Sequence, residues 1–108
     1  MIGRGLTFDW DDANRDHLAR HNVTPQEAEE VVQNDPLDTE LQTAEGNSEE
    51  ERLLQLGETS KGRILQLLTT WRDGKVRVIS GWDAPKQLKL YYLAKMRQRY
   101  GNTEDSEL

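Results

Sequence analysis

The chain has 108 residues and no cysteine, and its 20 acidic and 14 basic side chains give a formal net charge of −6. This length predicts a single domain, and the lack of cysteine excludes disulfides, thiolate metal sites and a cysteine nucleophile. No stretch approaches the roughly 18 apolar residues of a membrane span, and no apolar run resembles a signal peptide. We therefore expect a cytoplasmic protein without a membrane partner.

The N-terminal residues predict a short strand and then a helix. Residues 6–10 alternate apolar and polar side chains, as a half-buried strand does. Either Asp11 or Asp12 can cap a helix over residues 13–21. Asn22 then ends that helix in the left-handed conformation.

A second helix begins at the sequence Thr24-Pro25-Gln26-Glu27, which combines a capping box with a proline in the first turn. Its buried stripe follows helical spacing at Ala28, Val31 and Val32. The helix ends before Pro36, because the residue before a proline is pushed out of the helical region. Residues 37–41 then predict a short strand.

The middle of the chain predicts an antiparallel meander. Strands are expected at residues 52–57, 63–71 and 75–80, and Asp73-Gly74 is a hairpin signal between the last two. Residues 43–51 are polar and acidic, which favours a mobile loop. This loop can cover the basic strands that follow it.

The C-terminal part predicts one helix, with Asp83 as its cap and Pro85 in its first turn. Its apolar face is formed by Leu88, Tyr92, Met96 and Tyr100. Gly101 is expected to end the helix, and residues 101–108 to form an acidic, disordered tail. The fold class is therefore α+β: one domain over residues 1–100 with a small antiparallel meander, two N-terminal helices and one C-terminal helix.

Charge is distributed unevenly along the chain. Residues 1–50 hold 13 acidic and 3 basic side chains, whereas residues 51–100 hold 4 acidic and 11 basic ones. The C-terminal half can therefore bind a polyanion or an acidic protein. The alternative is that the two halves neutralise each other within the fold.

Several common active sites find no support in the residues. His17 and His21 have the spacing of two ligands on a helix, but no further ligand pattern accompanies them, so we expect no metal site and no cofactor. The acidic residues 9–16 suit the N-terminal turn of a helix better than a divalent ion. Neither a phosphate-binding glycine loop nor a nucleophile elbow is present.

The basic residues of the meander are the best candidates for a site. Arg63 and Arg77 fall on strands that the hairpin makes neighbours, and a shared face would give a forked donor surface for phosphate. Arg52 and Lys75 lie on the same meander. Aromatic side chains that can stack on bases follow nearby in sequence: Trp71, Trp82, Tyr91 and Tyr92. The alternative is that the arginines are exposed strand residues and the aromatic residues belong to the core.

The order of these motifs resembles the BrnT-type toxin family over roughly residues 6–94. The opening match consists of Phe8-Asp9-Trp10-Asp11, Asn14, His17, Arg20-His21-Asn22-Val23-Thr24 and Glu27-Ala28. The middle match consists of Asp35-Pro36, Glu51-Arg52, the stretch from Leu56 to Arg63, and Arg77-Val78-Ile79-Ser80, and Tyr91-Tyr92 follow on the last helix.

The resemblance implies a RelE-like fold and the toxin of a bacterial type II toxin–antitoxin pair. Such a toxin is a ribonuclease that blocks translation, and its partner is a ribbon-helix-helix antitoxin. DNA would be bound only through that antitoxin, in a complex that represses its own operon. The positions that match the family pattern for catalysis are Arg63, Arg77 and Arg52. From their residue types on and after the meander, we expect Trp82, Tyr91 and Lys75 to bind the RNA.

The chain departs from the family pattern at three positions. Trp82 stands where many members carry arginine, Leu88 where a glutamate is frequent, and Asn22 where glycine is usual. The alternative function is therefore a member with degraded chemistry that only binds an antitoxin or joins a repressor complex. A third possibility is an unrelated α+β interaction domain.

The active toxin would work without metal. The RNA 2′-hydroxyl attacks the adjacent phosphate, Arg63 and Arg77 stabilise the developing negative charge, and Arg52 holds the backbone. His21 is the one chemical candidate for the general base, because an ordinary histidine pKa of ~6.5 suits that role.

Overall fold

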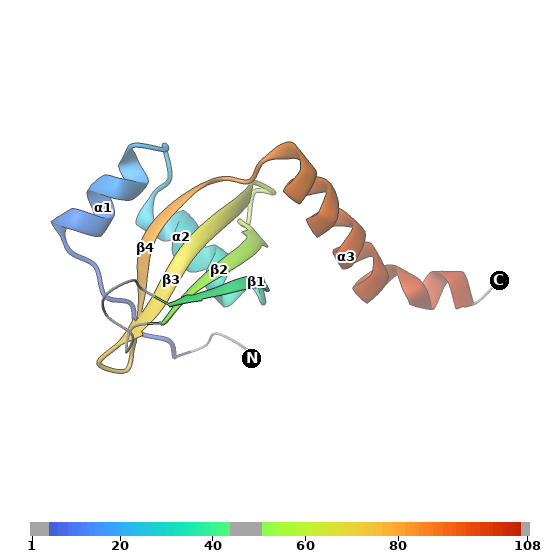
Figure 1. Ribbon diagram of the computed structural model, residues 1–108. Helices are drawn as coiled ribbons and strands as arrows, with labels where there is room; N and C mark the ends of the chain where they lie inside the picture. The colour runs from blue at the N-terminus through green and yellow to red at the C-terminus, as the bar shows by residue number, and fades with distance from the viewer. Residues whose placement is uncertain (1–4, 44–50, 107–108) are drawn as a thin grey trace.

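The computed structural model describes residues 5–43 and 51–106, without the side chains of residues 43 and 100–106. Its elements are α1 (Asp12–Ala19), α2 (Pro25–Gln33), β1 (Leu37–Thr43), β2 (Glu51–Glu58), β3 (Ile64–Arg72), β4 (Lys75–Asp83) and α3 (Lys86–Ser106). The strands form one antiparallel sheet in the order β1-β2-β3-β4 (Figure 1). The predicted α+β class, with two helices before the meander and one after it, is confirmed.

The two N-terminal helices begin at caps that the sequence predicts. Asp11 accepts a hydrogen bond from the Asn14 backbone N–H, and the Asn14 side chain accepts one from Asp11 in return. Thr24 and Glu27 form the same reciprocal pair at the start of α2. Between the helices Asn22 has a φ of +57°, the left-handed conformation expected of it.

The β3–β4 hairpin turns at the two residues that its sequence signal predicts. Asp73 and Gly74 both have positive φ, at +54° and +75°. A two-residue turn of this kind matches the right-handed twist of the flanking strands. The hairpin therefore fixes which residues of β3 and β4 face each other.

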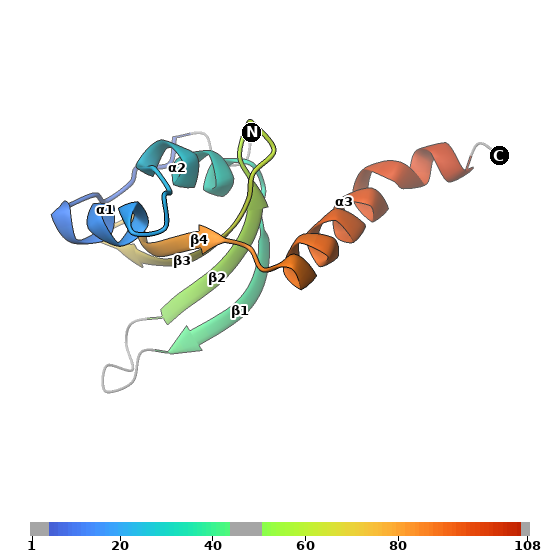
Figure 2. The same ribbon diagram turned by 90° about the horizontal axis from the view of Figure 1, so that it is seen from above.

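The sheet separates two apolar clusters. The larger one lies under α1 and α2 and consists of Leu18, Val23, Ala28, Val31, Val32, Leu65, Leu67, Val76 and Val78. The smaller one joins the first turns of α3 to the other face, through Leu56, Ile64, Ala84 and Tyr92, with Leu37, Leu88 and Met96 packed against them. Farther along, α3 extends away from the sheet (Figures 1 and 2), and its Arg99 pairs with Asp35 just before β1 at 3.0 Å.

Three local predictions are wrong. The strand expected at residues 6–10 is only a single parallel bridge between Phe8 and Val76. Asp83 does not cap the last helix, because it is the final residue of β4 and binds Arg63 instead. Gly101 does not end α3, which continues to Ser106. The predicted loop over residues 43–51 falls mainly on residues 44–50, outside the described residues.

Candidate active site

The sheet has one face that α1 and α2 leave uncovered, here called the open face. Val76 and Val78 point into the helix-side core, so Arg77 between them belongs to the open face. Trp82 donates its indole N–H to Gln66 Oε1 at 2.8 Å, and these two residues are cross-strand partners on that same face. Within the described residues, the first turns of α3 pack on part of this face.

Arg63 lies just before β3 and joins three parts of the chain. Its Nε and Nη2 donate to the two carboxylate oxygens of Asp83 at 2.9 and 3.0 Å. Its Nη1 donates to Glu27 at 3.1 Å and to the Asn22 carbonyl at 2.7 Å, while Nη2 also reaches the His21 carbonyl at 3.4 Å. A guanidinium has five N–H groups, so this arrangement gives every one of them a partner.

The electrostatics of this cluster follow from those contacts. Hydrogen bonds from Arg63 lower the pKa of Asp83, although partial burial opposes the shift. Partial burial raises the pKa of Glu27, but hydrogen bonds from the Thr24 backbone and from Arg63 outweigh it, so the net shift is downward. The two carboxylates raise the pKa of Arg63. All three groups are therefore charged near neutral pH.

His21 and Trp82 meet beside this cluster. Their ring centroids lie 6.0 Å apart and the rings are tilted by 59°. The α1–α2 turn carries His21, and Arg63 ties that turn to the end of β4 through the His21 and Asn22 carbonyls and Asp83. The structure thus brings His21, Arg63 and Trp82 to one end of the sheet.

Arg77 lies at the opposite end of β4, next to the N-terminal segment. Its Nη2 is 3.0 Å from Asp11 Oδ2, and its Nη1 is 3.6 Å from Asp9 Oδ1. Nη1 is buried and has no hydrogen-bond partner. The Arg77 side chain is only 12% exposed, whereas the Asp11 side chain is 50% exposed. Ion pairs with Asp9 and Asp11 therefore hold the Arg77 side chain against the N-terminal segment.

Of the other predicted site residues, Arg52 and Lys75 lie near Arg77, and Tyr91 lies on α3. Continuing the β2–β3 register one residue beyond the Leu53–Thr69 pair places Arg52 opposite Thr70. Thr70 in turn pairs with Arg77, so the Cα atoms of the two arginines lie about 10 Å apart in one row. Lys75 is exposed at the start of β4, close to that row. Tyr91 is exposed on α3, with Lys95 Nζ 5.5 Å from its ring centroid.

One predicted juxtaposition is wrong. Arg77 pairs with Thr70, seven residues along the chain from Arg63, which is roughly 23 Å at about 3.3 Å per residue. Arg63 and Arg77 therefore cannot bind the same phosphate group. The hairpin does make their strands neighbours, but the two side chains lie at opposite ends of them.

The alternative that assigned aromatic residues to the core holds for one of the four. Tyr92 is buried in the smaller cluster, whereas Trp71 is exposed on the helix side of the sheet. The sequence indicates no acidic partner for either arginine: it predicts caps at Glu27, Asp11 and Asp83, and it places Asp9 in a short strand before the first helix. Contacts between residues this far apart in sequence have no local signal.

The structure offers neither a metal cluster nor a membrane helix in its described part. No three histidine or carboxylate side chains gather within residues 5–43 and 51–106. Across the same residues no helix is long and apolar enough to cross a bilayer.

Comparison with known proteins gives a family. Residues 10–87 match the family described as the ribonuclease toxin BrnT of type II toxin–antitoxin systems. Comparisons with curated proteins and with solved structures found no match. The family match covers most of the chain and contains His21, Arg63, Arg77 and Trp82. The chain therefore belongs to the BrnT family of ribonuclease toxins of type II toxin–antitoxin systems.

Proposed function

We propose that this protein is a metal-independent endoribonuclease that blocks translation and acts at the end of the sheet where His21, Arg63 and Trp82 meet. The observation that carries the proposal is this cluster, because it combines a group able to take a proton, a forked cation and an aromatic ring. Family membership supports RNA as the substrate. We place the protein in the cytoplasm, where RNA is available.

The chemistry uses the RNA's own nucleophile. His21 takes the proton of the 2′-hydroxyl, the 2′-oxygen forms a bond to the adjacent phosphorus, and the bond from phosphorus to the 5′-oxygen breaks. The departing 5′-oxygen takes a proton from solvent, which leaves a cyclic phosphate and a 5′-hydroxyl end. Trp82 stacks on a neighbouring base, and Tyr91 lies on the helix that follows.

Arg63 stabilises the negative charge of the transition state on its Nε–Nη2 edge. Asp83 occupies that edge in the free protein with the two-oxygen geometry that a phosphate also presents. Asp83 is 56% exposed and Glu27 only 28%, so Asp83 is the partner that phosphate can displace. Arg52, Arg77 and Lys75 then bind the RNA backbone along the open face, which Trp82 also faces.

The test uses end-labelled RNA, purified protein and a chelator. We expect cleavage by the parent protein, a loss of about 10²–10⁴-fold in His21→Gln, and loss of cleavage in Arg63→Ala. Asp83→Asn is expected to cleave at least as fast as the parent, since it removes the carboxylate that competes with phosphate. A folded parent protein that leaves RNA intact contradicts the proposal, and so does an inactive but folded Asp83→Asn.

The second candidate function is binding without cleavage. It is favoured by one observation, namely that Arg63 has all five donors occupied and Arg77 faces two carboxylates. In that case neither the parent nor Asp83→Asn cleaves RNA, although both fold.

We also propose that a ribbon-helix-helix antitoxin neutralises the toxin, and that the complex binds DNA only through that antitoxin. Type II membership supports a protein antitoxin. The expected result is that a ribbon-helix-helix protein encoded next to this chain copurifies with it and suppresses RNA cleavage. Free toxin that binds operator DNA as tightly as the complex does would contradict this arrangement.

A further inference from the structure

We propose that the outer edge of β1, together with the cavity beside it, binds an extended, basic segment of a partner protein. The segment adds to the sheet as a strand, and one of its lysine or arginine side chains enters the cavity. This surface lies on the helix side of the sheet, away from the open face, so the inference does not depend on RNA cleavage.

The first observation is that β1 is an edge strand. The sheet order is β1-β2-β3-β4, and no strand in the described part of the chain pairs with the outer side of β1. Figure 2 shows β1 as the outermost strand. The other edge differs, because Thr7 and Asp9 form backbone hydrogen bonds with Val76 on β4. An uncovered edge offers backbone donors and acceptors to another strand.

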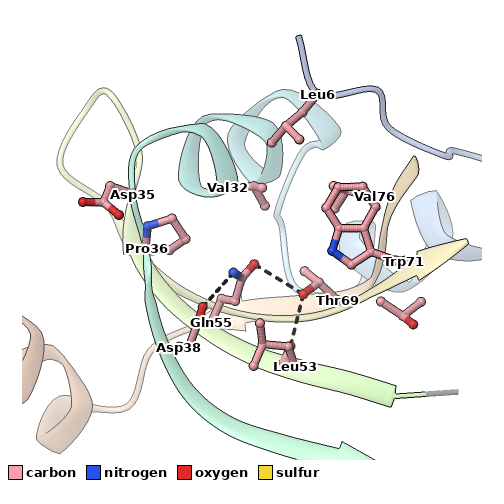
Figure 3. A pocket seen from close by; sticks show the side chains of 11 residues that line it. Leu6, Val32, Asp35, Pro36, Asp38, Leu53, Gln55, Thr69, Trp71 and Val76 are labelled. Carbon is pink, nitrogen blue, oxygen red and sulfur yellow. Dashed lines mark hydrogen bonds between the residues drawn. The ribbon is translucent and has the colours of Figure 1, made fainter. Parts of the chain in front are cut away.

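The second observation is a cavity of about 260 Å³ beside this edge. Its apolar walls include Leu6, Val32, Leu53 and Trp71, and its polar floor is a hydrogen-bonded chain (Figure 3). In that chain Thr69 donates to Gln55 at 3.3 Å, and Gln55 donates to Asp38 Oδ1 at 3.0 Å.

Two large apolar side chains near this cavity are exposed. Trp71 lines the cavity and is 64% exposed, and Leu41 is 63% exposed. Leu41 pairs across β1 and β2 with Leu53, a wall residue, so both belong to the same face of the sheet. Apolar surface of this kind next to an open edge favours a protein partner over solvent.

The third observation decides the charge of the partner. β1 carries the carboxylates Asp38 and Glu40, and the described residues 21–43, which include α2 and β1, contain no lysine or arginine. Asp38 is exposed at the cavity, and its second oxygen and the Trp71 ring can both attract a cation. Asp35, another lining residue, already pairs with Arg99 at 3.0 Å. A basic segment therefore suits this surface, and an acidic one is repelled.

The test follows the backbone amides of the full ¹⁵N-labelled chain during titration with two capped seven-residue peptides. One peptide alternates arginine and valine, and the other alternates glutamate and valine. We expect the basic peptide to shift the amides of residues 37–43 and the indole N–H of Trp71, and the acidic peptide to shift neither. The proposal is overturned if neither peptide binds, if the acidic one binds as tightly, or if the shifts lie on α3 or the open face.

Matched variants separate this site from general charge attraction. Asp38→Asn and Asp16→Asn each remove one carboxylate, but only Asp38 lies at the cavity. We expect the first to weaken binding by about fivefold and the second to leave it unchanged. Equal weakening by both variants would overturn the proposal.

Methylated peptides test the strand addition itself. N-methyl groups on the peptide edge that faces β1 should abolish binding, whereas the same groups on its other edge should not. Equal effects of the two peptides contradict strand addition. Concentration-dependent shifts of the β1 amides without any peptide would assign this edge to a second copy of the chain, and so overturn the proposal as well.

Discussion

At the scale of single residues, Arg63 shows how one side chain serves both fold and site. Its guanidinium joins α2, the α1–α2 turn and the end of β4, which no backbone hydrogen bond connects directly. These links hold in place the turn that carries His21 and the strand end that carries Trp82. The fork geometry matters here, since a lysine at this position could not reach the same partners.

Replacing Arg63 by methionine is expected to destabilise the protein by about 2 kcal/mol, because Glu27 and Asp83 lose a charged hydrogen-bond donor. Urea denaturation measures this loss. Arg20→Met is the control: its pair with Asp16 is more than 60% exposed on both sides, so we expect a change below about 0.5 kcal/mol. Equal losses in the two variants would show that Arg63 contributes no more than a surface ion pair.

The two carboxylates make stability depend on pH in the acidic range. Their pKa values are lower in the folded protein than in the unfolded chain. The ionised carboxylates therefore stabilise the folded state at pH values above their ordinary pKa values near 4. This contribution is lost as pH falls through the lower, folded pKa values. We expect the melting temperature to drop below about pH 4. The drop should be smaller in the double variant Glu27→Gln, Asp83→Asn, and an unchanged drop would assign it to other groups.

At the scale of elements, the packing of α2 on β2 depends on a position without a side chain. A Cβ at Gly57 would lie 2.8 Å from Val31 Cγ1 and 3.2 Å from Pro36 Cβ. Val31 is fully buried and Pro36 is rigid, so neither can move away easily. The glycine therefore sets how closely the helix approaches the sheet.

Gly57→Ala is accordingly expected to cost about 1–3 kcal/mol in unfolding free energy. In a Val31→Ala background the nearest clash is absent, so the same substitution should cost clearly less. Chemical denaturation of the four proteins in this cycle measures the coupling. Additive costs would place the strain somewhere other than this contact.

At the scale of the whole molecule, the smaller cluster decides whether α3 folds with the rest. Tyr92 is 2% exposed and packs with Leu56 and Ile64 of the sheet, whereas its neighbour Tyr91 is 46% exposed. The family match ends at residue 87, so most of α3 lies beyond it. The first turns of α3 are nevertheless part of the packed structure.

Tyr92→Ala should therefore cost about 3–5 kcal/mol, and Tyr91→Ala less than about 1 kcal/mol. Circular dichroism during thermal unfolding checks this, and we expect one cooperative transition in the parent protein. A separate early transition of helical signal would show that α3 folds independently of the sheet.

The sequence by itself determined the features that depend on neighbours along the chain. The caps at Asp11 and Thr24, the left-handed Asn22 and the Asp73-Gly74 turn are local, so their positions follow from residue type and spacing. The order of elements and the family resemblance follow from the same local patterns.

Only the tertiary structure decided which side chains meet. The register of β3 and β4 separated Arg63 from Arg77, because a strand rises about 3.3 Å with every residue between them. Folding also paired Arg63 with Asp83 and Glu27, and Arg77 with Asp9 and Asp11. These partners lie 20 to 68 residues apart in sequence, and electrostatic attraction acts across space, where spacing along the chain carries no information.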